Sequence, residues 1–137
     1  MTRRGETIPP DLSRPGKTTM FARALRRRCP ACGSGPMFVG WFHMVERCPG
    51  CNLRTNRGEQ GYTLGALWFN LLMAEGFSMT VFLATVVYTW PNPPWDTLQY
   101  LGPIEALVTP FIFWPFARGL FLAFDLCFRP VEERDRV

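Results

Sequence analysis

Residues 62–117 contain neither lysine nor arginine, although the whole chain carries fifteen basic residues in 137. Two apolar stretches lie in this run, 62–90 and 98–117, and each is long enough to provide the roughly 20 apolar residues that a helix needs to cross a bilayer core. Prolines at positions 91, 93 and 94 separate the stretches and predict a turn over 91–97. The run therefore predicts two transmembrane helices joined as a hairpin, in preference to the helical core of a soluble protein.

The charged residues that flank this apolar body are distributed unevenly. Residues 1–61 hold eleven basic and four acidic residues, a net charge of 11 − 4 = +7, whereas residues 118–137 balance four arginines against four acids. Basic segments stay on the cytoplasmic side and the loop at 91–97 has none, so we expect both termini in the cytoplasm and this loop outside. Three aromatic residues of the type that favours the headgroup level surround the loop: Trp90, Trp95 and Tyr100.

Four cysteines form two C-x-x-C pairs, Cys29-Pro-Ala-Cys32 and Cys48-Pro-Gly-Cys51, within a predicted head over 29–61. Fifteen residues separate the pairs, a spacing typical of a four-thiolate zinc site. Gly33 and Asn52 directly follow the pairs, and both residue types accept the left-handed conformation that such a turn requires. The segment between the pairs predicts a short hairpin, and zinc supplies folding free energy that so small a head lacks. A rubredoxin-like iron site uses the same ligands, so iron stays an alternative.

The remaining chemistry-bearing residues are few. His43 lies between the cysteine pairs and is expected in the hairpin, because four thiolates already complete a tetrahedron. Cys127 stands among phenylalanines and leucines and is expected to be a small buried hydrophobe. Two disulfides would need an oxidising compartment, which the cytoplasmic placement contradicts. A metal ion with four thiolate ligands has no open position for a substrate, and a chain with a single histidine has few groups for acid–base catalysis. We therefore expect that the protein is not an enzyme and has no catalytic residue.

A basic amphipathic segment, 18–28, precedes the head, and a flexible basic arm is predicted over 1–17 from its prolines and its lack of apolar periodicity. The segment is expected to bind anionic lipids, or the acidic face of a partner, through four arginines: Arg23, Arg26, Arg27 and Arg28. We do not expect nucleic acid as a partner. A membrane-tethered zinc-ribbon regulator that binds nucleic acid through the same surface is kept as an alternative.

Glu75 falls near the middle of the first predicted span, where an ionised carboxylate is costly. It is either a proton-relay or partner-pairing group, or a protonated side chain that bonds within its helix or is reached by water. Glu105 is expected at the outer interface, and a cytoplasmic interfacial helix with a charged tail is expected over 118–137. The spans carry more aromatic surface than two helices can bury between themselves, so part of it faces lipid or another protein, and a stand-alone monomer is not expected.

Three motifs together resemble a bacterial family catalogued as domain of unknown function 983. They are Arg28-Cys-Pro-Ala-Cys-Gly, the second pair Cys48-Pro-Gly-Cys, and the ending Pro115-Phe-Ala-Arg118-Gly119-Leu120. The resemblance covers roughly residues 25–130. Members often occur in the genomic company of cytochrome oxidase and its assembly factors, which implies a respiratory-chain role. Fourteen arginines against one lysine are typical of a GC-rich genome, such as an actinobacterial one.

The predicted fold is a mainly α protein of the bacterial cytoplasmic membrane: a two-helix transmembrane hairpin with a small N-terminal cytoplasmic head of the four-cysteine, zinc-ribbon-like kind. The predicted function is that of a non-catalytic accessory or assembly-associated subunit of a respiratory complex, either a cytochrome oxidase or a bc–oxidase supercomplex. The alternative from another class is a rubredoxin-like redox or metal-handling membrane protein.

Overall fold

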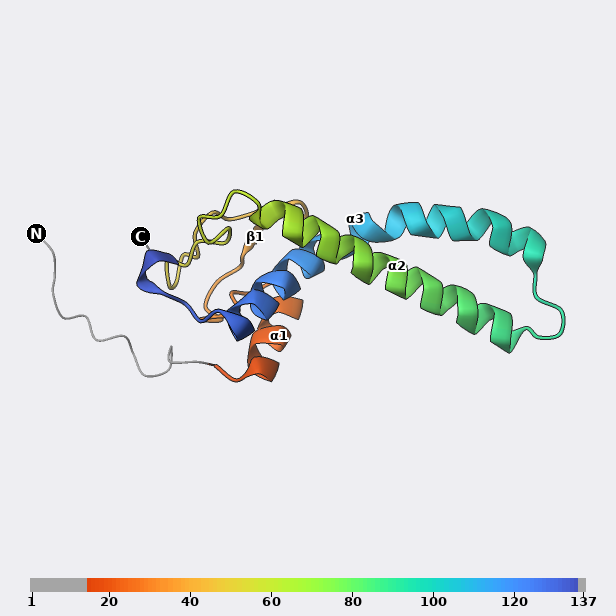
Figure 1. The fold of residues 1–137 in the computed structure, drawn as a ribbon, viewed down its shortest axis with the longest axis horizontal. Coiled ribbons are helices and arrows are strands. Elements are labelled where there is room, and N and C mark those ends of the chain that lie inside the picture. Colours follow the sequence, from red (N-terminus) through yellow and green to blue (C-terminus); the bar gives the residue numbers. More distant parts are fainter. Residues whose placement is uncertain (1–14, 136–137) are drawn as a thin grey trace, which may run out of the picture.

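The computed structural model describes residues 15–135; residues 1–14, most of the predicted flexible arm, and residues 136–137 lie outside the described part. The elements follow in the order α1 (Lys17–Leu25), β1 (Phe38–Val39), β2 (His43–Met44), α2 (Tyr62–Tyr88), α3 (Trp95–Phe128) and the 3₁₀ helix η2 (Glu133–Asp135). Figure 1 shows α2 and the first half of α3 projecting as an antiparallel pair from a head that holds α1, the strands and the C-terminal segment. The predicted class, a mainly α fold with two long apolar helices and a four-cysteine head, is confirmed.

Helix α2 contacts α3 along one narrow stripe. The buried residues recur at every fourth position: Tyr62, Ala66, Asn70, Ala74 and Ser78. Because three of these side chains are small, the two helices approach closely, and at the neighbouring Gly65 an added Cβ would lie 2.9 Å from the Phe121 ring. These small residues form the contact between the helices, whereas Gly76 lies outside it, because an added Cβ there would meet nothing within 4 Å.

Helix α3 continues to Phe128, although the sequence predicts a span that ends at 117 and a separate helix after it. Three prolines lie inside it, and each lacks the N–H that a helix normally donates to the carbonyl four residues earlier. Pro115 thereby leaves the Phe111 carbonyl without its helical donor. Trp41, from the loop between β1 and β2, donates its Nε1–H to this oxygen at 2.9 Å. The helix bends in this region (Figure 1) yet stays continuous, because a side chain from the head replaces the missing donor.

A second side chain supports α3 near the same point. Asn70 of α2 donates its Nδ2–H to the Pro110 carbonyl at 2.9 Å. Trp114, one residue before Pro115, donates its Nε1–H to the Phe42 carbonyl at 3.2 Å. The bend in α3 is therefore held from one side by α2 and from another by the β1–β2 loop.

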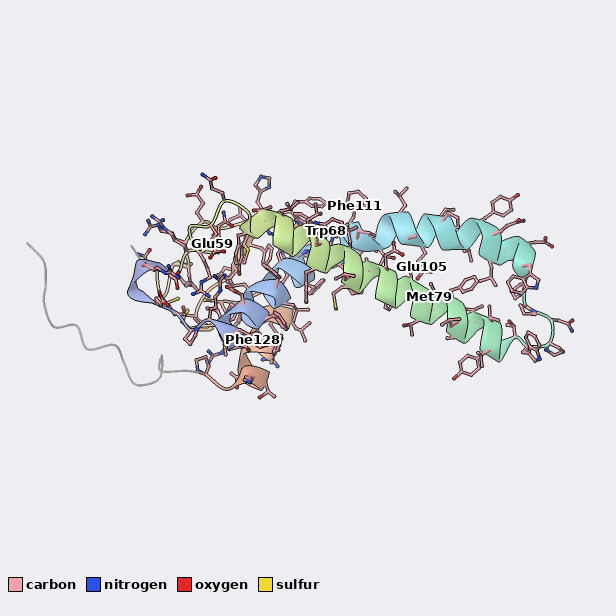
Figure 2. All side chains as sticks on the ribbon, viewed as in Figure 1. Glu59, Trp68, Met79, Glu105, Phe111 and Phe128 are labelled. Carbon is pink, nitrogen blue, oxygen red and sulfur yellow. The ribbon has the colours of Figure 1, made fainter. Side chains whose placement is uncertain are left out.

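Helices α2 and α3 are long and apolar enough to cross a membrane. Only 6% of the most apolar stretch of α2 and 33% of that of α3 is buried, whereas the core helix of a soluble protein is mostly buried. On α2 the exposed Trp68 and Tyr88 are 20 residues apart, which a helix spans in about 30 Å. This length equals the hydrocarbon thickness of a typical bilayer, and aromatic rings favour its two boundaries. Figure 2 shows Trp68 and Phe111 at the head-side end of the hairpin, with Met79 and Glu105 farther along.

The core of the head combines the two ends of the described chain. Helix α1 buries Met20 and Ala24 against the last turns of α3, which contribute Leu122, Ala123 and Leu126. Gly119 permits this approach, because an added Cβ would lie 3.2 Å from the Ala24 carbonyl oxygen. The segment that was predicted as a separate interfacial helix is thus the part of α3 on which the head is built.

Candidate metal centre

The four cysteines of the two pairs converge on one point. Their Sγ atoms all lie within 4.8 Å of one another, with 3.7 Å between Cys29 and Cys51 and 3.5 Å between Cys32 and Cys48. A tetrahedral zinc ion with Zn–S bonds of about 2.3 Å places its sulfurs about 3.8 Å apart, so the donor set fits such an ion. Cys29 and Cys48 are buried and the other two are half-buried. The site that the sequence predicts is therefore assembled, and it can hold a metal ion.

The two halves of the centre have the same local structure. The amide of Gly33 donates to the Cys29 carbonyl at 2.8 Å, and the amide of Asn52 donates to the Cys48 carbonyl at 2.9 Å. Gly33 and Asn52 have φ angles of +70° and +57°, which confirms the predicted left-handed turns. An added Cβ at position 33 would also lie 2.8 Å from Arg23 Nε, so the Arg23 side chain would have to shift away from its bond to the Ala31 carbonyl.

The predicted hairpin between the pairs is present. Strands β1 and β2 are antiparallel, with Phe38 opposite Met44 and Val39 opposite His43. His43 is exposed and is not part of the cysteine cluster, in keeping with its predicted place in the hairpin. Thr55 fastens the second pair to this hairpin by donating its hydroxyl to the Val45 carbonyl at 2.7 Å.

The thiols of the cluster differ in acidity. Burial raises the pKa of Cys48 to about 11. Burial acts in the same direction on Cys32, but hydrogen bonds from Ser34, whose Oγ lies 3.0 Å from the Cys32 sulfur, outweigh it and lower that pKa to about 7. A divalent cation binds the deprotonated form of each thiol, so metal binding here releases protons. Four thiolates leave no open position on a tetrahedral ion, and such a site supports structure.

The head itself uses two of the four predicted lipid- or partner-binding arginines. Arg23 donates to the Ala31 carbonyl at 3.0 Å, within the first cysteine pair. Arg27 donates to the Gly40 carbonyl, and its guanidinium lies over the rings of Phe38 and Trp41, 5.2 and 5.4 Å from their centroids. The other two, Arg26 and Arg28, are both exposed and follow the end of α1.

A buried ion-pair network, the clasp, joins the metal-binding segment to the C-terminal segment. Arg57 donates to Asp125 at 2.8 Å and to Asp135 at 2.7 Å. It also donates to the carbonyls of Arg129 and Pro130, at 2.7 and 3.1 Å. Burial acts to lower the Arg57 pKa, but its two carboxylate partners outweigh this effect and raise it. Burial likewise acts to raise the Asp135 pKa, and its bond to Arg57 outweighs that effect and lowers it.

The sequence does not predict the clasp. Arg57 lies 68 residues from Asp125 and 78 from Asp135, so no local spacing connects them. One signal was available: Asp125 is the only charge in the otherwise apolar segment 119–128, and a carboxylate in such a place needs a cation.

The two carboxylates within the apolar stretches of α2 and α3 lie on different faces. Glu75 is exposed on the side of α2 that faces away from α3, and no side-chain hydrogen bond or ion pair involves it within residues 15–135. Glu105 is half-buried, ten residues inside α3, on the face that carries the buried Leu98 and Thr109. Ten residues correspond to about 15 Å of helix between the start of α3 and Glu105, and its interfacial position stays a prediction.

The sequence model of the family described as "Protein of unknown function (DUF983)" matches residues 38–125, which are 125 − 38 + 1 = 88 of the 137 residues. This match agrees with the resemblance: it covers the second cysteine pair and the proline–arginine–glycine ending, and it begins after the first cysteine pair. No curated protein and no solved structure matches the chain.

Proposed function

The chain belongs to the DUF983 family, and we propose that it is a non-catalytic accessory protein of a membrane-embedded respiratory complex, a cytochrome oxidase or a bc–oxidase supercomplex. In this proposal α2 and α3 span the membrane, the four cysteines hold a structural zinc ion, and the hairpin docks on the complex through α2. The respiratory identity of the partner rests on the genomic company of the family. The need for a partner rests on one observation, the position of Glu75.

The placement of the helices in a membrane follows from the head. The head-side ends of α2 and α3 are tied together by Arg57 and Asp125, so both ends lie on one side of any bilayer that the helices cross. Residues 1–61 carry a net charge of +7, and basic segments stay on the cytoplasmic side. We therefore place the head in the cytoplasm and the 91–97 loop outside.

Glu75 occupies the middle of an apolar surface. The face of α2 opposite α3 is otherwise formed by exposed apolar side chains: Leu64, Trp68, Leu72, Met79 and Leu83. Glu75 is seven residues, or about 10 Å, from Trp68 toward the outer loop, and about 20 Å from Tyr88 at the far end of the helix. A charged side chain at such a depth costs about 3 kcal/mol when it faces lipid.

A partner helix relieves this cost if it brings a basic or hydrogen-bond-donating side chain to the depth of Glu75. The neighbouring Gly76 favours the contact, because open space surrounds the position where its Cβ would be, and small residues let helix backbones approach. This face, Leu64 to Leu83 with Glu75 at its centre, is the proposed docking face.

Affinity purification in a mild detergent tests the partner. We expect the tagged chain to co-isolate haem-containing subunits, identified by a reduced-minus-oxidised absorption spectrum and by mass spectrometry. Glu75→Leu should lose them, whereas Glu105→Leu, the same change at a carboxylate on the α2-facing side of α3, should retain them. A wild-type preparation without haem subunits contradicts the respiratory partner, and full retention by Glu75→Leu contradicts the docking face.

Metal analysis of the same preparation tests the head. We expect one zinc ion per chain and no visible absorption from the isolated protein. The four thiolates suit iron as well, so stoichiometric iron with a red, reducible chromophore would replace the structural role with electron transfer.

A further inference from the structure

A basic pocket lies beside the first cysteine pair. It has a volume of about 420 Å³ and is lined by the end of α1, the first cysteine turn and β1: Arg26, Arg27, Arg28, Ser34, Gly35, Pro36 and Phe38. Three of its seven lining residues are arginines and none is acidic. Its volume is in the range of pockets that bind small molecules.

The backbone fixes the shape of this pocket. Arg27 has a φ of +59°, and this left-handed residue turns the chain where α1 ends, so that three consecutive arginines line one cavity. The Met37 amide donates to the Arg27 carbonyl at 3.1 Å, and the Cys29 amide donates to the Gly35 carbonyl at 3.2 Å. The opposite wall is thereby tied to the arginine wall, and the pocket exists before a ligand binds.

The arginine side chains in the pocket have unused donors. Arg26 and Arg28 reach the surface, and neither forms a salt bridge with a described acidic residue. The Nε of Arg27 is buried and has no hydrogen-bond partner within the described chain. Guanidinium groups present paired N–H donors that match the oxygens of a phosphate. We propose that this pocket binds the phosphate group of an anionic phospholipid.

The surroundings of the pocket favour a lipid over a soluble phosphate. Phe38 lines the pocket, and the adjoining hairpin exposes Val39, Trp41 and Phe42 at 69%, 42% and 51%. Trp41 reaches the Phe111 carbonyl in the apolar part of α3, so this exposed surface continues onto a membrane-spanning helix. A phosphate in the pocket thus lies beside apolar side chains that can contact acyl chains, the arrangement of a lipid headgroup site.

This inference does not rest on the respiratory partner. The proposed lipid pocket lies on the head, at the cytoplasmic boundary of the membrane. The proposed docking face lies elsewhere, on α2 around Glu75. A result that contradicts the docking face therefore does not contradict the lipid pocket, and the reverse also holds.

The test uses the full chain purified in neutral micelles. Native mass spectrometry measures the binding of phosphatidylglycerol and, separately, of phosphatidylcholine. We expect one tightly bound phosphatidylglycerol per chain and weak binding of phosphatidylcholine. Arg26→Gln combined with Arg28→Gln should weaken the phosphatidylglycerol complex about 25-fold, at about five-fold per arginine. The corresponding double lysine variant keeps the charge but not the paired donors, and its loss should be smaller.

The control removes the same charge elsewhere. Lys17→Gln combined with Arg134→Gln changes two exposed cations outside the pocket and should weaken binding less than about two-fold, because the site is local. Equal losses in the two glutamine variants, or equal binding of both lipids, overturn the proposal. Inorganic phosphate at the same concentration as the lipid should not displace it. Displacement would show that the pocket binds a soluble phosphate, and it would overturn the proposal of a lipid ligand. Metal content and far-ultraviolet circular dichroism of each variant confirm that it is folded.

Discussion

Replacement of Arg57 by methionine tests whether the clasp holds the head closed. The side chains of Arg57 and Asp135 are each only 2% exposed. Removing one partner of such a buried pair costs about 3–5 kcal/mol, because the other charge stays buried without compensation. Asp125 is 14% exposed and keeps Arg129 Nε at 2.9 Å. The cost therefore falls mainly on Asp135, whose carboxylate keeps, among residues 15–135, the Glu132 amide at 3.0 Å. We therefore expect Arg57→Met to lower the free energy of opening the clasp by about 3 kcal/mol, the lower end of that range.

Hydrogen exchange in detergent micelles measures this loss locally. The Arg54 amide donates to the Asp135 carbonyl at 2.9 Å and reports opening of the clasp. A loss of about 3 kcal/mol corresponds to exchange about 150-fold faster in peptides that cover 53–58. The matched control is Arg134→Met. Its ion pair with Glu132 is 69% and 61% exposed, so it should change the free energy of opening by less than about 1 kcal/mol.

A double variant separates the buried charge from the lost contacts. If the unpaired Asp135 carboxylate causes the loss, Asp135→Asn in the Arg57→Met background should recover part of it, with a coupling energy of about 1–3 kcal/mol. If the free-energy changes of the two substitutions simply add, the unpaired Asp135 carboxylate is not the cause of the loss, and the reasoning is refuted.

The same carboxylate predicts a dependence on pH. Because Arg57 lowers the Asp135 pKa below its unfolded value of about 3.9, its stabilisation is complete above that value and is lost as the pH falls through the folded pKa. Clasp opening in the wild type should therefore become easier below about pH 4. The Asp135→Asn variant, which has no carboxylate at this position, should not show this dependence of clasp opening on pH.

Trp41→Phe keeps the ring but removes the donor to the Phe111 carbonyl, and we expect about 1–3 kcal/mol lower local stability, seen as faster exchange around the bend of α3; unchanged exchange would contradict the role of Trp41. Gly33→Ala forces a Cβ toward Arg23 at a positive φ, so the head should lose its metal at a lower temperature than the wild type, whereas Gly61→Ala, with nothing within 4 Å of its Cβ, should not. Removal of the metal by a strong chelator should unfold the head while the circular dichroism of α2 and α3 persists, and collapse of the whole helical signal would show that the hairpin depends on the metal.

The parts of the structure that the sequence predicts are those with local signals. Each cysteine pair is a self-contained turn, and Gly33 and Asn52 mark where each turn needs a positive φ. The start of α2 at Tyr62 follows from the loss of basic residues at that point. The family motifs also lie in these local segments. Such features depend on neighbours within a few residues, and a sequence displays them directly.

The end of α3 could not be predicted in this way. Pro110 and Pro115 are strong local signals for ending a helix. The side chains that support α3 near them, Asn70 and Trp41, lie 40 and 70 residues away from the carbonyls that they bind, and Trp41 replaces the donor that Pro115 lacks. The clasp could not be predicted for the same reason, because Arg57 contacts Asp125 and Asp135 only after the chain has folded back. Long-range contacts of this kind leave no spacing in the sequence by which they can be recognised.

The clasp also sets an order of events during biosynthesis. A ribosome makes the cysteine pairs and Arg57 before α2 and α3, and it makes Asp135 after both. In the proposed membrane topology, the clasp can therefore close only when α3 has returned to the side of the membrane from which α2 departed. A chain inserted with its two head-side ends on opposite faces would leave Arg57 and Asp125 separated by the bilayer. In that topology, formation of the clasp therefore requires that both helices are inserted correctly.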